Sequence, residues 1–381
     1  MKQNKYKIIL IAGARPNFMK IAPLMHALKD HPTLEAILVH TGQHYDEKMS
    51  HSFFEQLNIP KPHINLEVGS GSHAVQTAKI MERFEKVCFA EKPDMILVVG
   101  DVNSTAACSL VAAKLHIKVT HYEAGLRSRD RDMPEEINRL VTDAITDLYI
   151  TTSQDASDNL FQEGVAKEQV YMLGNLMIDS LVSQLEKATA LTLDLSDLYG
   201  KPLENSWSQS KSGYAMMTFH RPSNVDNKEA LSSLVEQWIK TSEILPILFP
   251  IHPRTQNMLE QFGLMDRMQS APNIYLTGPL GYLEFLKLVS ESALVITDSG
   301  GIQEETTYLK IPCLTVRPTT ERPVTIWEGS NQLIKGDEIY SRAAESLNAS
   351  RDKYQVPKYW DGASAGRIVG LLERFFLEPV S

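Results

Sequence analysis

Short apolar runs alternate with amphipathic stretches along most of the chain. In the first half such runs predict buried strands near residues 7–12, 35–40, 94–100, 117–121 and 148–151. Between them the apolar residues recur at helical spacing, as in residues 73–91. A second series of strands is predicted at residues 214–219, 244–249, 273–276, 293–297 and 312–316. Strands that alternate with helices in this way indicate an α/β fold with parallel sheets.

The alternation stops between residues 191 and 212, where the chain is polar and poorly periodic and is predicted to form a loop. The preceding stretch is expected to contain the crossing between two Rossmann-like domains, residues 1–175 and 176–362. An amphipathic helix within residues 363–381 is expected to pack back on the first domain. Two facing domains of this kind bind ligands in a central cleft, at the carboxyl ends of their strands.

Composition narrows the class of protein. The chain has 381 residues, 43% of them hydrophobic, which is enough for two cores of ordinary size. Its net charge of −9 is dispersed, which argues against binding to nucleic acid. Cys88, Cys108 and Cys313 lie in apolar surroundings and are expected to be reduced, as in a cytoplasmic protein. The apolar run at residues 8–12 is predicted to be a strand rather than a signal segment, and no stretch has the length of a membrane span.

The most informative segment is residues 294–305. An apolar strand is expected to end at Asp298, followed by a Ser-Gly-Gly turn and an amphipathic helix that carries Glu304 and Glu305. The free N–H groups at that helix start favour a phosphate, and the carboxylates are suited to ribose hydroxyls. No Lys follows the glycines, so the loop is not of the type that grips a transferable phosphate. An ordinary strand–turn–helix corner with a Ser cap explains the pattern equally well.

Polar residues also follow the strands of the first half. Arg15 and Lys20 come after the first strand and are placed to reach a phosphate. Asp101 follows the strand at 94–100, where it serves either chemistry or a turn. Glu123 follows the next strand, and capping does not explain it easily because Glu is a poor cap.

In the second half, His220-Arg221 and a His252-Pro-Arg254 segment occupy equivalent points at the ends of two strands. Paired His–Arg clusters favour anion binding. The histidines between residues 40 and 51 lack the spacing of a metal site, and the chain has no nucleophile motif. Pro134, Glu135 and Glu136 satisfy a helix start by themselves.

Taken in order, the motifs resemble those of the non-hydrolysing UDP-N-acetylglucosamine 2-epimerases. The similarity runs from about residue 8 to about residue 335. The motifs that carry it are Gly-Ala-Arg-Pro at 13–16 with Lys20, Thr-Gly-Gln-His at 41–44, Gly-Asp at 100–101, His-Tyr-Glu-Ala-Gly-Leu-Arg at 121–127, Pro-Glu-Glu-Ile-Asn-Arg at 134–139, Asp-Ser-Gly-Gly-Ile-Gln-Glu-Glu at 298–305 and Thr-Thr-Glu-Arg-Pro at 319–323. This resemblance implies a GT-B fold and a homodimer. It also implies interconversion of UDP-GlcNAc and UDP-ManNAc, a step towards cell-surface polysaccharide precursors, with no metal and no other cofactor.

The resemblance further implies a mechanism in which UDP leaves C1 as C2 loses its proton, giving 2-acetamidoglucal, and then adds back. It assigns catalysis to Asp101, Glu123, Glu135 and His220. It assigns UDP or substrate binding to Arg15, Lys20, Arg139, Arg221, His252, Ser299, Gly300, Gly301, Glu305 and Arg322. A second, regulatory UDP-GlcNAc site is implied at Gln43, His44 and Glu136.

Departures from the family pattern leave the sugar open. Asn17 stands where many members have Glu, Phe219-His-Arg-Pro-Ser223 replaces Gly-His-Arg-Arg-Glu, and Asp46 replaces the second Gln of a regulatory motif. A related 2-epimerase acting on UDP-2,3-diacetamido-glucuronate is one alternative, with Arg254 available for its carboxylate. A hydrolysing epimerase, a GT-B glycosyltransferase and a non-catalytic nucleotide-sugar sensor are others.

Overall fold

The computed structural model describes residues 5–42, 61–199 and 213–378. Contacts divide the chain into two compact units. The first unit contains the residues up to Ser183 and the residues from Lys358 onward, and the second is Gln184–Pro357. The sequence pattern places this boundary at residue 175 and the return of the chain at residue 363. In the structure the first unit extends further, to Ser183, and the chain re-enters it earlier, at Lys358.

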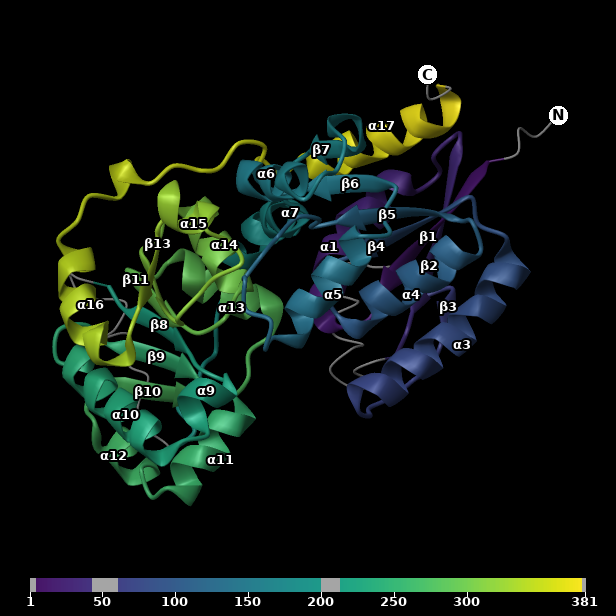
Figure 1. Cartoon of the computed structure of the whole chain (residues 1–381). Coiled ribbons are helices and arrows are strands. Elements are labelled where there is room, and N and C mark those ends of the chain that lie inside the picture. Colours follow the sequence, from purple (N-terminus) through teal and green to yellow (C-terminus); the bar gives the residue numbers. More distant parts are fainter. Residues whose placement is uncertain (1–4, 43–60, 200–212, 379–381) are drawn as a thin grey trace. The chain divides into compact units, whose positions relative to one another are not determined.

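In the described part of the first unit, seven parallel strands form one sheet in the order β3-β2-β1-β4-β5-β6-β7 (Figure 1). The strands are β1 Tyr6–Ala12, β2 Leu34–His40, β3 Ile64–Asn65, β4 Met95–Val99, β5 Lys118–Tyr122, β6 Leu148–Thr151 and β7 Val170–Met172. The helices are α1 Arg15–Leu28, α3 His73–Glu91, α4 Asn103–Lys114, α5 Pro134–Asp143, α6 Gln154–Gln162, the short η1 Lys167–Gln169, α7 Leu176–Ala190, which runs on into the second unit, and α17 Ser364–Leu377.

The second unit has a sheet of six parallel strands among its described residues, in the order β10-β9-β8-β11-β12-β13. The strands are β8 Ala215–Thr218, β9 Ile247–Pro250, β10 Ile274–Thr277, β11 Leu294–Thr297, β12 Cys313–Val316 and β13 Asn331–Ile334. The helical segments are α9 Pro222–Val225, α10 Lys228–Ser242, α11 Pro253–Gln261, α12 Met265–Ser270, α13 Tyr282–Ser290, α14 Gly301–Leu309, α15 Val324–Trp327, η2 Gly336–Glu338, α16 Ile339–Leu347 and η3 Arg351–Lys353.

The central strands are largely apolar because helices cover both faces of each sheet. Every residue of β4 is buried, as is every residue of β11. In the first unit, Ile80 and Phe84 of α3 pack against Ile96 and Val98 of β4. Carboxylates are therefore expected beyond the ends of such strands, and this places the candidate site.

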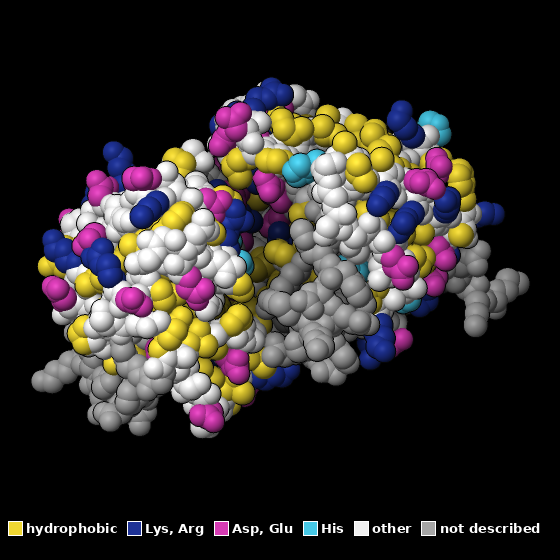
Figure 2. Space-filling model, turned by 90° about the horizontal axis from the view of Figure 1, so that it is seen from below, with side chains coloured by type: hydrophobic (Ala, Val, Ile, Leu, Met, Phe, Trp, Pro, Cys, Tyr) yellow, Lys and Arg dark blue, Asp and Glu magenta, His cyan; other side chains and the backbone are white. Residues whose placement is uncertain are grey.

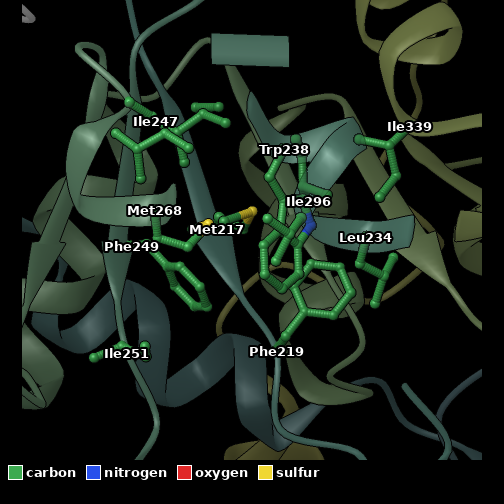
Figure 3. Packing of buried hydrophobic residues seen from close by; sticks show 14 of the residues in the cluster. Met217, Phe219, Leu234, Trp238, Ile247, Phe249, Ile251, Met268, Ile296 and Ile339 are labelled. Atoms are coloured by element: carbon green, nitrogen blue, oxygen red, sulfur yellow. The ribbon is translucent and has the colours of Figure 1, made fainter. Parts of the chain in front are cut away.

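Trp238 of α10 lies at the middle of the core of the second unit (Figure 3). Its ring contacts Phe219 and Phe249, with ring centroids 4.9 and 5.6 Å apart. Met217 and Ile296, from the central strands β8 and β11, belong to the same cluster. This cluster fixes the strand ends that carry His220 and Asp298.

Helix α17 belongs to the first unit although it comes last in the chain. Its first backbone N–H groups, from Ser364 and Ala365, donate to the carboxylate of Asp179 at 3.1 and 2.7 Å. Near its other end Phe376 stacks on Tyr6, with ring centroids 4.5 Å apart. A buried carboxylate at the helix start and an aromatic stack near its end hold the chain terminus on the first sheet.

Most predicted strands agree with the structure to within three residues at each end, and the helix predicted at 73–91 has these bounds. Three strands lie outside the predicted pattern: β3, β7 and β13. All three are at the edges of their sheets, where one side lacks a strand neighbour and the residues are less apolar.

The surface carries charges of both signs. On the face drawn in Figure 2, Lys and Arg side chains alternate with Asp and Glu side chains over both units. Among the described residues, no helix combines the length and the apolar character that crossing a membrane requires.

The core of the second unit provides a test of the packing. We expect Trp238→Ala to lower the free energy of unfolding by about 3–5 kcal/mol, because it leaves a cavity among buried aromatic rings. Trp327→Ala is the matched control, since that Trp is 70% exposed, and we expect a change within about 0.5 kcal/mol. Urea unfolding followed by far-ultraviolet circular dichroism measures both. Equal midpoints for the two variants would contradict the assignment of Trp238 to the core.

Candidate active site

The carboxyl ends of β4 and β5 bring the first predicted carboxylates to one edge of the first sheet. Val99 pairs with Tyr122 in the parallel register, so Asp101 and Glu123 both follow directly after paired strand ends. Gly100 lies among the side chains concerned. A Cβ atom added there would meet Glu123 Oε2 at 3.3 Å, Lys20 Nζ at 3.3 Å and Asn17 Nδ2 at 3.4 Å. A side chain at position 100 would therefore crowd this cluster.

Lys20 and Glu123 form a buried ion pair inside that cluster. Their side chains are 7% and 3% exposed. Burial of the two charges is tolerated only because they lie side by side. Lys20, which the sequence assigns to UDP binding, is thus a partner of a predicted acid/base carboxylate in this structure.

Asp101 is held by Arg139, which α5 supplies. The Nη2 atom of Arg139 lies 2.6 Å from Asp101 Oδ2, and its Nη1 atom lies 2.6 Å from Glu136 Oε2. Arg139 is buried, whereas the side chain of Asp101 is 29% exposed. The guanidinium therefore holds a partly accessible carboxylate in place with a charge-assisted hydrogen bond.

Glu136 is buried by its neighbours. Its carboxylate accepts hydrogen bonds from the N–H groups of Ser128 and Arg129 and from the guanidinium of Arg139. Burial raises the pKa of Glu136, but these donors together bring it below its ordinary value. Because these bonds use both oxygens, Glu136 fixes the loop before α5. Glu135, next to it, is exposed in the first turn of α5.

Asn17 closes the turn between β1 and α1. Its Oδ1 atom accepts from the N–H groups of Gly13 and Ala14, at 3.0 and 2.8 Å, and its Nδ2 atom donates to Val99 O. The amide of Asn17 therefore serves the backbone. Arg15 lies at the start of α1, with its side chain outside the described atoms, and Gln43 and His44 lie outside the described residues.

In the second unit, Asp298 is the centre of the cluster that contains His220. It is fully buried, and its carboxylate accepts from the backbone N–H groups of His220 and Arg221 and from Asn224 Nδ2. The Nδ1 atom of His220 lies 3.0 Å from Asp298 Oδ1. Burial raises the pKa of Asp298, but His220 and these donors bring it below its ordinary value. The carboxylate thus fixes the imidazole so that Nε2 is the nitrogen left for a ligand.

A second imidazole, that of His252, lies beside His220, with ring centroids 5.6 Å apart. His252 Nδ1 accepts from the N–H of Arg254, so Nε2 carries the ring hydrogen in the neutral form. Burial, the charge of His220 and the charge of Arg254 lower the pKa of His252, with Asp298 acting in the opposite direction. His252 therefore presents a ring N–H to a ligand, and His220 presents Nε2, which donates only when that ring is protonated.

The segment at 298–305 has the predicted form of a strand, a turn and a helix, with α14 starting at Gly301. The N–H of Ser299 donates to Thr297 Oγ1. The candidate phosphate donors are therefore the N–H groups of Gly300 and Gly301, at the positive end of the helix dipole. A Cβ atom at Gly300 would meet Glu321 Oε1 at 3.0 Å and Arg322 Nη1 at 3.4 Å, so Arg322 lies close to this helix start.

The two carboxylates of α14 differ in their surroundings. Glu304 is paired with Arg322, with Oε1 and Nε 3.0 Å apart. Glu305 is buried beside Tyr282, whose hydroxyl lies 3.4 Å from Glu305 Oε1. Burial raises the pKa of Glu305 to about 7, and the charge of Glu304 acts in the same direction. A carboxyl whose proton is lost near neutral pH is a candidate functional group.

The structure adds residues that the sequence does not assign: Asp298, Asn17, His121 and Asp143. Most of their partners are distant in the chain, and the positions of His121 and Asp298 at the ends of predicted strands are the signals visible in the sequence. Among the described residues, no group of three or more His, Cys, Asp or Glu side chains is arranged to hold a metal ion.

The chain is similar to known proteins over nearly its whole length. The family model described as UDP-N-acetylglucosamine 2-epimerase matches residues 26–373. A Methanocaldococcus jannaschii protein named UDP-N-acetylglucosamine 2-epimerase is 41% identical over 96% of this chain and 98% of its own length. A Pseudomonas aeruginosa protein named UDP-2,3-diacetamido-2,3-dideoxy-D-glucuronate 2-epimerase is 38% identical, over 97% of this chain and 99% of its own.

Solved structures are similar over nearly the whole chain. The crystal structure of the Methanocaldococcus jannaschii UDP-GlcNAc 2-epimerase in complex with UDP-GlcNAc and UDP has a TM-score of 0.83 and 41% identity, covering 96% of this chain and 99% of that one. A structure from Listeria monocytogenes, a putative UDP-N-acetylglucosamine 2-epimerase by its description, has a TM-score of 0.84 and 30% identity, covering 99% of this chain and 98% of that one. With its GT-B-like two-domain fold, the chain belongs to the UDP-N-acetylglucosamine 2-epimerase family.

Proposed function

We propose that this enzyme interconverts UDP-GlcNAc and UDP-ManNAc without hydrolysing them, in the supply of precursors for cell-surface polysaccharides. The observation that carries the proposal is the cluster at the ends of β4 and β5. Asp101, which is partly exposed, follows β4, and Glu123 follows the adjacent strand β5. Glu123 forms a buried ion pair with Lys20. Acid and base groups so close together suit a reaction that removes a proton from carbon and returns it.

The chemistry needs such groups because the C2 hydrogen of the sugar is not acidic. In the proposed reaction the C1–O bond breaks and its electron pair leaves on the β-phosphate of UDP. C2 gives up its proton to a carboxylate, and a C1=C2 double bond forms in 2-acetamidoglucal. A proton then returns to the opposite face of C2, and UDP adds back to C1. We assign the proton transfers to Asp101, Glu123 and Glu135.

The departing UDP must be held while it is separate from the sugar. We assign its diphosphate to the N–H groups of Gly300 and Gly301, to Arg322, and to the imidazoles of His220 and His252. Preorganised N–H donors and cations stabilise the charge that develops on the leaving phosphate. We assign the ribose hydroxyls to Glu305. Arg15 and Arg221 complete the set expected to contact UDP.

The main alternative is the related UDP-2,3-diacetamido-glucuronate, because a 38% identical relative carries the name of its 2-epimerase. A uronate requires a free cation for its carboxylate. Arg254, the candidate cation, is bound to Asp226 through two hydrogen bonds of 2.8 and 2.5 Å. This pairing favours the neutral N-acetylhexosamine.

Proton NMR of the purified enzyme with UDP-GlcNAc tests the reaction. We expect UDP-ManNAc to accumulate until the two nucleotide sugars reach a constant ratio. Free ManNAc with UDP would instead identify a hydrolysing epimerase. No reaction, together with turnover of UDP-2,3-diacetamido-glucuronate, would show that the proposed sugar is wrong.

Asp101→Asn tests the carboxylate at the end of β4. We expect turnover to fall by about 10²–10⁴-fold, as it does when a general acid or base is removed. Asp94→Asn is the matched control, because Asp94 lies just before the same strand and its carboxylate accepts from the N–H of Lys7. Initial rates with UDP-GlcNAc measure both variants. Turnover close to that of the wild type in Asp101→Asn would remove Asp101 from the mechanism.

The pKa of Glu305, raised by burial to about 7, predicts a pH dependence of UDP binding. Below pH 7 the carboxyl is neutral, and above pH 7 it is the carboxylate that accepts best from ribose hydroxyls. We therefore expect the affinity for UDP to rise as the pH increases from 6 to 8, as measured by calorimetry. Glu305→Gln removes this carboxyl but leaves the phosphate titration of UDP in place. A pH dependence identical in the two proteins would refute the ribose assignment.

We also propose that the enzyme is a homodimer and acts in the cytoplasm. Apolar side chains on the surface of α3 support an interface between subunits, since Val75 and Phe89 are 49% and 62% exposed. These two residues lie 14 positions apart, close to four helical turns, and so on one side of the helix. Light scattering should give twice the chain mass, and a reduced mass in Phe89→Asp. A monomeric wild-type protein would contradict the dimer.

A further inference from the structure

His121 of β5 is fully buried, two residues before Glu123, and both nitrogens of its ring have an acceptor. Its Nδ1 atom lies 2.7 Å from Asp143 Oδ1, and its Nε2 atom lies 2.9 Å from the carbonyl oxygen of Gly100. A carbonyl oxygen can only accept, so Nε2 carries a hydrogen. The imidazole therefore links the last residue before Asp101 to the end of α5.

Asp143 extends this link to the turn that follows Glu123. Its Oδ2 atom accepts from the N–H of Gly125 at 3.0 Å and lies 2.7 Å from Arg127 Nη1. Arg127 in turn binds Glu163 through two hydrogen bonds of 2.9 and 2.6 Å. One buried carboxylate thus contacts His121 on one side and the Gly125–Arg127 turn on the other.

The backbone at this point is unusual. Glu123 has a φ angle of +72°, in the left-handed region that side chains other than glycine rarely adopt. The next turn residue, Gly125, has a φ of +77°, and a Cβ there would lie 2.1 Å from Ala156 O. Such a conformation persists only where the surroundings enforce it, and it is frequent at functional sites.

We propose that His121, held by Asp143, is a positioning residue that sets the spacing of the carboxylates of Asp101 and Glu123. On one side of the imidazole, Nε2 holds the carbonyl of Gly100, the residue before Asp101. On the other side, Nδ1 holds Asp143, whose carboxylate fixes the turn that follows Glu123. This role rests on the proposed function, because it gives the two carboxylates a common support for the proton transfers.

The charges of the network agree with a ring that carries hydrogen on both nitrogens. Asp143 and Glu163 are anionic, Arg127 is cationic, and a doubly protonated His121 makes the sum of the four charges zero. Burial raises the pKa of Asp143, but His121, Arg127 and the Gly125 N–H bring it below its ordinary value. The other titratable group that the structure places on Asp143 is Tyr149, whose hydroxyl donates to the backbone carbonyl of Asp143. Neutrality removes much of the cost of burying the charges.

Asp143→Asn tests the proposal by activity. The amide can keep its oxygen for Gly125 and Arg127 only by turning Nδ2 towards His121 Nδ1, so the ring loses its hydrogen on Nδ1 and the anionic partner that holds it. We expect kcat to fall by about 10²-fold, the effect of a displacement of about 1 Å in a catalytic group. The affinity for UDP should be nearly unchanged, because all of its assigned contacts except Arg15 belong to the second unit.

Asp147→Asn is the matched control. Asp147 lies at the opposite, amino end of the same sheet, where its carboxylate accepts from Lys118 and from the N–H of Val119. We expect its kcat to be that of the wild type even if its melting temperature falls. A wild-type kcat in Asp143→Asn, or an equal loss in both variants, would overturn the proposal.

NMR of the wild-type enzyme with ¹⁵N-labelled histidine detects the hydrogens on the ring of His121 directly. This measurement depends neither on the folding of a variant nor on the substrate. We expect one imidazole with slowly exchanging hydrogens on both nitrogens, absent in His121→Gln. The His220–Asp298 pair does not imitate this signal, since the side chain of His220 is 41% exposed and exchanges with water. A single ring hydrogen on His121 would overturn the proposal. An enzyme inactive on UDP-GlcNAc that still gives the expected spectrum would contradict the proposed function alone.

Discussion

Parallel strands buried on both faces place carboxylates only beyond their ends, and the candidate site depends on this constraint. β4 is apolar throughout, and Asp101 comes two residues after it. β5 ends at Tyr122, and Glu123 comes next. In the second unit, β11 is buried from Leu294 to Thr297, and Asp298 follows at once. The sheets thus gather carboxylates at their carboxyl edges because no other position along these strands accepts them.

Burial removes water from these carboxylates, so each one needs a cation or hydrogen-bond donors beside it. Glu123 lies against Lys20, Glu136 against Arg139, and Asp298 accepts a set of backbone and side-chain donors. These pairs avoid the large cost of an isolated buried charge. Glu305 is different, because its hydroxyl neighbour Tyr282 is neutral and burial raises its pKa to about 7. The first unit therefore holds fixed ionic pairs, and the second unit adds one carboxyl whose pKa lies near neutral pH.

The fold could be predicted from periodicity, since the inner strands are continuous apolar runs bounded by turn residues. The edge strands β3, β7 and β13 could not, because short, partly exposed strands lack that signal. Strand ends also located Asp101, Glu123 and His220. The partners of these residues were beyond reach: nothing local in the sequence shows that Lys20 pairs with Glu123, or that Glu136 is buried under Ser128 and Arg129. The first pairing joins distant parts of the chain, and the second depends on the path of the loop before α5.

The central claim is that the C1–O bond breaks when C2 loses its proton. UDP-GlcNAc with ¹⁸O in the bridge between C1 and phosphorus tests it directly, with the reaction run in D₂O and followed by phosphorus and proton NMR. If the bond breaks, the ¹⁸O label moves into non-bridging positions of the β-phosphate and deuterium appears at C2 of the product. Epimerised product that keeps all of its ¹⁸O in the bridge, or its original hydrogen at C2, would contradict it.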